Sequence, residues 1–205
     1  MSHFIRPCPS RKDESTIDTM VYIEKFIKDL HPEKILDIGC GDGYLEEKYP
    51  DRITGIDIEP DRVADLKTRG LHNVQVGDAT ALSFDNHSFD MAIARDLIEH
   101  LHIEQVFAMF RSVLRVLKPN GVFVITTWRD CQIFWDKVDH IRPYSNKWVR
   151  NLCRYGMPDF DIYFEKELSA GIPLFGVLKL TWLAHLLADK FKIRVDHGII
   201  VLKKK

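Results

Sequence analysis

The stretch Ile35-Leu36-Asp37-Ile38-Gly39-Cys40-Gly41-Asp42-Gly43 sets three glycines directly behind a short apolar run. The run at 34–38 predicts a buried strand, and residues 44–48 predict the opening of a helix. Glycines permit positive φ and let the backbone approach a ligand closely, while a helix N-terminus presents free N–H groups. Such a loop alone is typical either of nucleotide binding or of a tight strand-to-helix turn, so the rest of the chain has to separate the two.

The segments on both sides of this loop alternate between strand and helix patterns. Short apolar runs predict strands at 34–38, 52–58, 74–76, 89–94 and 122–127. Helical spacing of apolar residues predicts helices at 13–30, 44–48, 60–69 and 103–117, the last of them stopped by Pro119-Asn120-Gly121. This alternation predicts an α/β fold, a Rossmann-like doubly wound sheet with helices on both faces. Further along, 144–155 predicts a helix, and 160–166 and 194–202 predict the last strands.

Three aspartates stand at the ends of successive predicted strands. Asp57 ends the second strand, where a carboxylate can accept from both hydroxyls of a ribose. Asp78 ends the third strand, where a carboxylate can accept an adenine amino hydrogen. Asp37 lies inside the first strand, and a carboxylate there suits a ligand that carries an ammonium group rather than a pyrophosphate. Each aspartate alone is also typical of a turn or cap.

The overall composition limits the other classes of function. The chain has 205 residues, 45% of them hydrophobic and 29% charged, which predicts one ordinary globular domain. Its net charge of -1 lacks the basic surplus of a general nucleic-acid binder, so no nucleic-acid partner is expected. The four cysteines form no Cys-x-x-Cys pair and residues 1–30 hold no apolar h-region, which predicts free thiols in a cytoplasmic protein.

With these residues in place, the chain resembles the class I S-adenosylmethionine-dependent methyltransferases. The likeness is strongest to the broad type-11 group, which includes the ubiquinone and menaquinone C-methyltransferases. The matching stretches follow the family's order within residues 33–128: 35–43, 55–58, 77–84, 89–101 and 114–127. The resemblance implies S-adenosylmethionine as cofactor, S-adenosylhomocysteine as product, and an antiparallel strand near the C-terminal end of the sheet.

The resemblance also assigns a role to each cofactor-binding position. It implies that Asp37 and the loop of Gly39, Cys40, Gly41 and Gly43 hold the methionine part of the cofactor. It further implies that Asp57 binds the ribose, that Ile58 packs on the adenine, and that Asp78 with Ala79 reads the adenine edge. Arg95 and Asp96 are implied to line the cofactor at the end of the fourth strand.

A nicotinamide dehydrogenase is the main rival because it also combines a glycine loop with an acidic strand end. Its usual loop is Gly-x-Gly-x-x-Gly, whereas the spacing here is Gly-x-Gly-x-Gly. A short-chain dehydrogenase also needs a Tyr-x-x-x-Lys pair near the later strands. The pair formed by Tyr44 and Lys48 lies directly behind the glycine loop, which is the wrong place. These differences favour the methyltransferase.

The first candidate for acceptor chemistry is the segment 95–102, which follows the fourth strand. It lacks the Asn/Asp-Pro-Pro-aromatic signature of enzymes that methylate exocyclic or amide nitrogens. Asp96 and His100 are four residues apart and would share a face if the segment were helical. His100 is therefore a candidate general base. The alternative is that His100 packs or caps beside the cofactor pocket, and that Glu99 is structural.

The second candidate is the loop after the fifth strand, at 128–144. His140 is a second candidate catalytic residue, and Trp128, Trp135, Arg142 and Tyr144 are candidate contacts to a planar or anionic acceptor. The alternative is a loop anchored on the sheet by its aromatic residues. A metal site from His100, His102 and His140 is not expected, because methyl transfer needs no metal and the chain has no His-x3-His helix pair.

The stretch 171–188 is nearly apolar around a whole helical wheel from Leu174 onward, yet it is short for a membrane span. It predicts a helix buried under the sheet or at a dimer contact. The sharper interpretation is a wall for a lipid acceptor or a shallow membrane contact.

Together these observations predict one methyltransferase domain over 1–205. Its parts are an N-terminal helix at 13–30, a cofactor-binding core at 33–128, acceptor-side loop and helices at 129–190, and a last strand with a solvated basic tail at 191–205. The predicted activity is methyl transfer by in-line displacement to a small-molecule, sugar or lipid acceptor. A protein-directed methyltransferase and a non-catalytic cofactor-binding module stay open, and the oligomeric state is not predicted.

Overall fold

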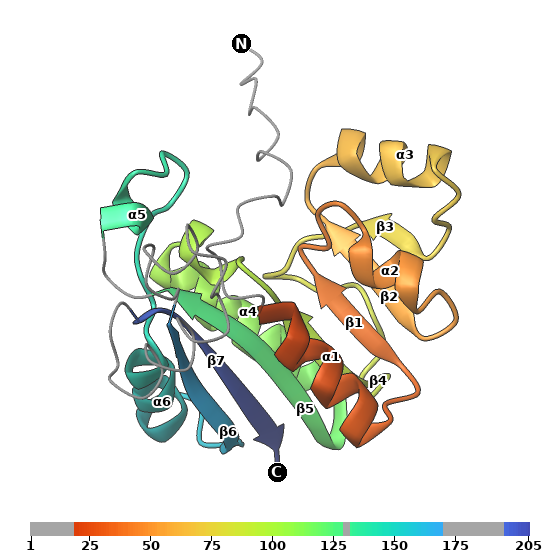
Figure 1. The fold of residues 1–205 in the computed structure, drawn as a ribbon. Coiled ribbons are helices and arrows are strands. Elements are labelled where there is room, and N and C mark those ends of the chain that lie inside the picture. The colour runs from red at the N-terminus through yellow and green to blue at the C-terminus, as the bar shows by residue number, and fades with distance from the viewer. Residues whose placement is uncertain (1–18, 129–131, 170–194) are drawn as a thin grey trace, which may run out of the picture.

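A computed structural model describes residues 19–128, 132–169 and 195–205, and these form one seven-stranded sheet with helices packed on it (Figure 1). The strand order is β3-β2-β1-β4-β5-β7-β6. The strands are β1 (Ile35–Ile38), β2 (Ile53–Asp57), β3 (Val74–Val76), β4 (Phe89–Ala94), β5 (Leu117–Trp128), β6 (Phe160–Ser169) and β7 (Val195–Lys204). β7 pairs antiparallel with both β5 and β6, and the other pairs are parallel. This confirms the predicted mostly parallel sheet with an antiparallel C-terminal strand.

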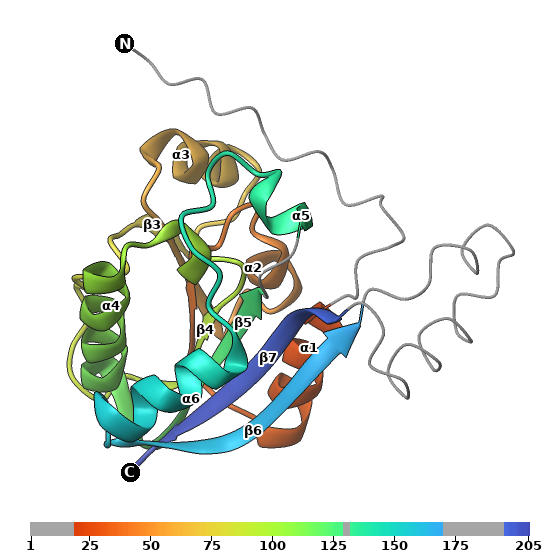
Figure 2. The same cartoon turned by 90° about the vertical axis from the view of Figure 1, so that its left-hand side faces the viewer.

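Helices cover both faces of the sheet, as predicted (Figure 2). They are α1 (Thr19–Leu30), α2 (Tyr44–Lys48), α3 (Pro60–Thr68), the 3-10 helix η1 (Ile98–His100), α4 (Ile103–Val116), α5 (Gln132–Trp135) and α6 (Asn146–Tyr155). α1 packs on one face through Met20, Ile23 and Ile27, and α4 packs on the other face together with α6. Apolar residues three or four positions apart give α1, α4 and α6 one buried side each.

Several element boundaries differ from the predicted ones by one or more residues. α4 ends at Val116, and β5 begins at once at Leu117 instead of at 122. Pro119-Asn120-Gly121 lies in a bulge, because Phe89 pairs with Leu117 while Met91 already pairs with Val122. A bulge tolerates proline because no ladder hydrogen bond needs its missing N–H. The N-terminal helix is described from Thr19 onward, and 13–18 lie outside the described residues.

The prediction of a solvated basic tail was wrong. Lys203 and Lys204 belong to β7, and the Lys204 ammonium donates to the carbonyl oxygens of Leu114 at 2.7 Å and Leu117 at 2.8 Å. The last carbonyls of a helix have no partner within the helix, so a cation at the end of α4 stabilises them. The sequence pattern did not reveal this role, because the sheet brings β7 alongside β5.

The order of the strands decides where a ligand fits. β1 and β4 are neighbours in the sheet, and the chain leaves them towards opposite sides of the strand order. Ligands of such sheets bind outside the carboxyl ends of the strands at this switch point. The stretch 171–188 lies outside the described residues. Among the helices that are described, none combines the length and apolar character needed to cross a bilayer.

Candidate functional site

The glycine loop connects β1 to α2 with all three of its glycines at positive φ, between 55° and 76°. Residues with a Cβ rarely adopt this conformation. At Gly43 the space is closed as well, because an added Cβ would lie 2.8 Å from Leu71 and 2.9 Å from Leu66. The backbone at Gly43 therefore lies against Leu66 of α3 and against Leu71, with no room for a side chain between them.

Asp57, at the carboxyl end of β2, ties the loop to the neighbouring strand. One carboxylate oxygen accepts from the backbone N–H of Gly41 at 3.2 Å and from the Arg62 guanidinium at 3.1 Å. The other accepts from the backbone N–H of Glu59 at 3.0 Å. The Asp57 side chain is 5% exposed, whereas that of Arg62 is 39% exposed. The Arg62 guanidinium can therefore move into solvent when a ligand binds to the Asp57 carboxylate.

Beneath the loop, two acidic side chains share one buried place. Asp37 of β1 is 5% exposed, and Glu46 of α2 is fully buried. Burial first, and then the charge of Asp37, raise the pKa of the Glu46 carboxyl to about 8. Gly55 of β2 makes the room, since a Cβ there would lie 2.5 Å from a Glu46 oxygen. Sequence reasoning missed Glu46, because Glu46-Glu47 looks like an ordinary exposed pair on a short helix.

We expect Glu46→Gln to change how the free energy of unfolding depends on pH. In the folded chain the carboxyl keeps its proton up to about pH 8, whereas the unfolded chain loses it near its ordinary pKa of 4.5. The stability due to neutral Glu46 is therefore complete below pH 4.5 and declines as the pH rises through 8. Urea unfolding at pH 5 and pH 8.5 should show the variant gaining about 2 to 4 kcal/mol on the native chain. An unchanged difference between the two pH values would contradict this.

The predicted adenine side lies at the ends of β2 and β3. Ile58 follows β2 and is 67% exposed, a large apolar side chain left open to solvent. Asp78 is exposed, and one of its oxygens accepts from the backbone N–H and the hydroxyl of Thr80, each at 2.7 Å. Ala79 is half-buried and packs against the core. The surface therefore offers an apolar contact, Ile58, and an acceptor, Asp78, at neighbouring strand ends.

Arg95 and Asp96 follow β4, and their side chains form an ion pair at 3.7 Å. Asp96 has a φ of 50° and is fixed to β5 by Thr126, whose hydroxyl donates to the carboxylate at 2.9 Å and accepts the Asp96 N–H at 2.8 Å. The segment is therefore not an α-helix, and only 98–100 form a short 3-10 helix. The expected common helical face of Asp96 and His100 does not exist.

The fold instead brings His100 together with His140, the second candidate catalytic residue. Their rings lie 5.0 Å apart, centroid to centroid, and a carboxylate oxygen of Glu99 and one nitrogen of each ring lie within 4.8 Å of one another. The loop is docked by its backbone, because Ile141 N–H donates to the Glu99 carbonyl at 2.8 Å. Residues forty positions apart in the sequence thus form one cluster beyond the end of β4.

Burial sets the charge of this cluster. Glu99 is 1% exposed, and within 19–128, 132–169 and 195–205 no hydrogen bond of good geometry reaches its carboxylate oxygens. Desolvation raises the pKa of Glu99 well above its ordinary range, and nearby Asp96 adds to that effect. Desolvation also lowers the pKa of His140 to about 4, so this imidazole is neutral at physiological pH. His100 is more open, and its Nδ1 lies 3.0 Å from the Asp139 carbonyl oxygen.

The aromatic residues proposed as acceptor contacts fall into different environments. Trp128 is 6% exposed at the end of β5 and packs on His140 and His197 with centroid distances of 5.5 and 3.7 Å. Tyr144 is fully buried, and its hydroxyl donates to the Leu101 carbonyl at 3.0 Å. Trp135 and Arg142 are exposed. The geometry gives Tyr144 the structural role of anchoring the loop.

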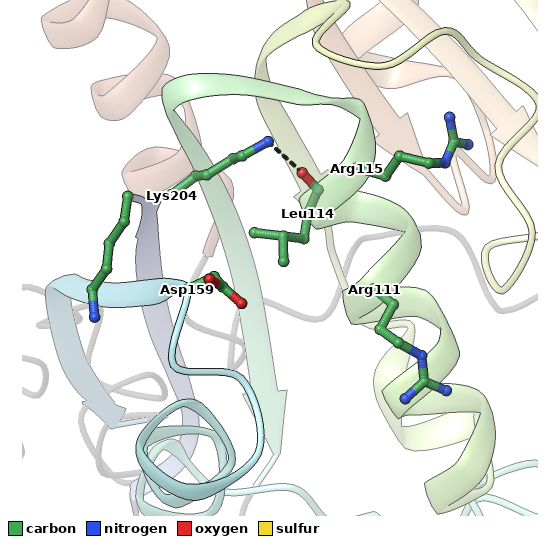
Figure 3. Close-up of a pocket in the computed structure, with 6 residues that line it drawn as sticks. Arg111, Leu114, Arg115, Asp159 and Lys204 are labelled. Carbon is green, nitrogen blue, oxygen red and sulfur yellow. Dashed lines mark hydrogen bonds between the residues drawn. The ribbon is translucent and has the colours of Figure 1, made fainter.

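A hollow of about 380 Å³ lies elsewhere, between the end of α4 and the last residues of the chain (Figure 3). It is lined by the basic side chains Arg111, Arg115, Lys204 and Lys205 with Leu114 and Asp159. Three of these cations are already used: Lys204 and Lys205 donate to backbone carbonyls, and Arg115 donates to the carbonyls of Leu82 and Phe84. The hollow lies at the amino end of the parallel strand β5, away from the strand ends that form the candidate site, and the hydrogen bonds of Arg115, Lys204 and Lys205 stabilise the fold.

Comparison with known proteins finds that the chain is similar to methyltransferases. The model of a family described as "Methyltransferase domain" matches residues 36–125. The chain is 33% identical to phosphoethanolamine N-methyltransferase 1 of Zea mays over 197 residues, which is 91% of this chain and 34% of that protein. It is 36% identical to 2-methyl-6-phytyl-1,4-hydroquinone methyltransferase of Synechocystis sp., over 50% of this chain and 36% of that protein.

Solved structures share the fold at lower identity. A SAM-dependent methyltransferase from Archaeoglobus fulgidus superposes with a TM-score of 0.63 at 21% identity, over 90% of this chain and 94% of that one. The [4+2]-cyclase SpnF superposes with a TM-score of 0.59 at 23% identity, over 83% of this chain and 74% of that one. These likenesses concern the fold alone. The chain spans about a third of the length of the two curated relatives described above.

Proposed function

Because the chain belongs to the class I S-adenosylmethionine-dependent methyltransferases, we propose that it transfers the methyl group of this cofactor to a small-molecule acceptor. The observation that carries the proposal is the set of carboxylates at successive strand ends around a loop of positive-φ glycines. Asp37 lies in β1, Asp57 ends β2 and Asp78 follows β3. This order matches the ammonium group, the ribose and the adenine of an aminoacyl nucleoside that lies across the strand ends. S-adenosylhomocysteine is the product that this reaction leaves in the site.

The cofactor contacts follow from the positions of these residues. Asp57 faces the ribose hydroxyls once Arg62 moves off its carboxylate, and Ile58 offers an apolar surface to the adenine. Asp78 accepts from the adenine amino group through the oxygen that Thr80 does not use. Asp37 lies below the loop for the ammonium group of the methionine part. Arg95 and Asp96 line the cofactor from β4, and Cys40 is a buried part of the loop.

A small acceptor is favoured over a macromolecule by the relatives. By their names, the two curated relatives methylate a phosphorylated amine and a lipid-tailed hydroquinone. The relatives therefore do not favour an amine acceptor over a ring acceptor. A protein acceptor is the second candidate, and a cofactor-binding module without turnover is the third. The cyclase among the structural neighbours illustrates that the fold alone does not decide this.

We place the acceptor against His100 and His140, beyond the end of β4. Methyl transfer is an in-line displacement, so the acceptor's nucleophile has to reach the methyl group from the side opposite to the sulfur, and much of the catalysis is positioning. A hydroxyl or ammonium acceptor also loses a proton. His140 is a poor base because burial lowers its pKa to about 4. His100 is the better placed of the two to act on that proton, directly or through a bound group.

The test is binding first and turnover second. Calorimetry should show one site for S-adenosylmethionine and one for S-adenosylhomocysteine. Incubation with methyl-labelled cofactor should then transfer label to a member of a panel of phosphorylated amines, hydroquinones and small-molecule fractions of a cell extract. Failure to bind either nucleoside would overturn the proposal. Label found only in protein would replace the small acceptor by a protein, and binding without any transfer would leave the module.

His100→Gln is expected to reduce kcat at least about tenfold while the Kd for S-adenosylmethionine stays within twofold. Glutamine keeps a polar group at this half-buried place but does not act as a base. The matched control is His72→Gln, which changes an exposed histidine behind α3. Equal losses in both variants, or a loss confined to cofactor binding, would remove His100 from the acceptor chemistry.

We also propose that the protein works in the cytoplasm. The described cysteines Cys40 and Cys153 are buried free thiols, and burial raises the pKa of both, so neither is poised to form a disulfide. Fractionation of cells that express the full chain with a fluorescent tag tests this. The same experiment tests the lipid contact proposed for 171–188, because such a contact would place tagged protein in the membrane pellet.

A further inference from the structure

The cluster of Glu99, His100 and His140 combines features that a catalytic base alone does not explain. Glu99 is a carboxylic acid that is 1% exposed, and among the described residues no hydrogen bond of good geometry reaches either of its oxygens, although the Trp128 side chain is near enough to lower its pKa. The Nδ1 atom of His140 is likewise buried and has no hydrogen-bond partner of good geometry in the part of the chain that the structure describes. Buried polar groups are nearly always paired in proteins, so two such groups side by side indicate a missing ligand. The ligand has to satisfy a carboxylate and an imidazole together.

The second imidazole is already oriented for the same ligand. Nδ1 of His100 lies 3.0 Å from the carbonyl oxygen of Asp139, and a carbonyl only accepts. This nitrogen therefore carries the proton in the neutral ring, and Nε2 keeps its lone pair. A backbone carbonyl that holds the other ring nitrogen in this way is the usual support of a histidine that binds a metal. The Asp139 carboxylate lies 3.5 Å from the same Nδ1 and adds to the stabilisation of the proton there.

We propose that Glu99, His100 and His140 bind one divalent transition-metal ion at the acceptor side of the site. One ligand atom from each residue lies within 4.8 Å of the other two, so small side-chain rotations bring all three to a common ion. Two imidazoles and one carboxylate suit Zn²⁺, Mn²⁺ or Fe²⁺ and leave coordination positions open. Mg²⁺ and Ca²⁺ prefer oxygen ligands and fit less well.

The ion's role rests on the proposed function, whereas its binding does not. Glu99 and His100 follow β4 within a few residues of Asp96, and His140 lies against them from the loop after β5. An oxygen of the acceptor on an open coordination position would therefore lie near the carboxyl ends of the strands, where the cofactor is proposed to bind. A divalent ion lowers the pKa of a bound hydroxyl and releases its proton to solvent, leaving the oxygen as nucleophile. In this arrangement His100 acts as a ligand, and it does not have to take up the proton itself.

Metal binding is tested without methyl transfer. The full chain, purified without a histidine tag and treated with a chelator, is titrated with Co²⁺, whose absorption reports coordination by nitrogen, and Zn²⁺ is then added as competitor. One equivalent of Co²⁺ should bind and be displaced by Zn²⁺. Glu99→Gln and His140→Phe should each weaken binding at least tenfold. Glutamine keeps the shape of the acid, and phenylalanine keeps a ring beside Trp128 and Phe134.

The control is His72→Phe, which replaces an exposed histidine behind α3 and should bind Co²⁺ as the native chain does. Thermal unfolding by circular dichroism shows whether each variant folds, and Zn²⁺ should raise the Tm of the native chain and of the control alone. Equal binding by native chain and both ligand variants overturns the metal site. Calorimetry with S-adenosylmethionine on the same samples reports the proposed function separately, because its outcome does not depend on the metal.

Discussion

Asp57→Ala should weaken S-adenosylmethionine binding by about 100-fold or more and leave the chain folded. In the proposed site the carboxylate accepts from two ribose hydroxyls, and each hydrogen bond to a charged group contributes about 1.5 to 3 kcal/mol. The same side chain holds the Gly41 N–H at 3.2 Å, so its removal also loosens the glycine loop. Both effects act on the cofactor, and calorimetry at fixed ionic strength measures their sum.

The matched control is Asp61→Ala, an exposed aspartate in the first turn of α3, four residues along the chain. It removes the same charge from the same region without touching the loop and should change the Kd by less than twofold. Thermal unfolding separates lost binding from lost structure. A native-like Kd for Asp57→Ala would show that the ribose is held elsewhere, which would put the whole alignment of cofactor and strand ends in doubt.

The elements around the glycine loop could be predicted because their determinants are local. Apolar runs, glycines and strand-end aspartates follow one another along the chain, and a parallel sheet turns sequence order into spatial order. β3 and β4 appear with the predicted bounds, as does α2. What the pattern could not show was Glu46, since its burial depends on the space that Gly55 leaves on a different element.

The cluster proposed as the acceptor side could not be predicted, because its contacts join residues far apart in the sequence. The cluster near His140 depends on how a loop folds back over η1, and Ile141 docks there through its backbone, which carries no side-chain signal. Asp96 and His100 would share a face only in a helix, and the positive φ of Asp96 is incompatible with one. Lys204 shows the same limit at the C-terminus, where a tail-like lysine caps a helix.

Gly198→Ala is expected to lower the free energy of unfolding by about 3 kcal/mol. Gly198 lies in the middle of β7, where an added Cβ would stand 2.4 Å from the Asn146 side-chain oxygen and 2.6 Å from the Thr127 hydroxyl. Asn146 is 4% exposed and accepts from Thr127 at 2.8 Å while donating to the Lys166 carbonyl at 3.0 Å. The methyl group has to push this buried amide off its partners, which costs both overpacking and hydrogen bonds.

A double-mutant cycle tests whether the clash is the cause. Asn146→Ala removes the hydrogen bonds but makes room for the methyl group of Gly198→Ala, so the double variant should be far less destabilised than the sum of the two. The control is Gly70→Ala. Gly70 has open space around its Cβ position but a φ of 90°, and its variant measures backbone strain without a clash. Additive losses at 146 and 198 in urea unfolding would show that β7 is strained there and that the amide is not the obstacle.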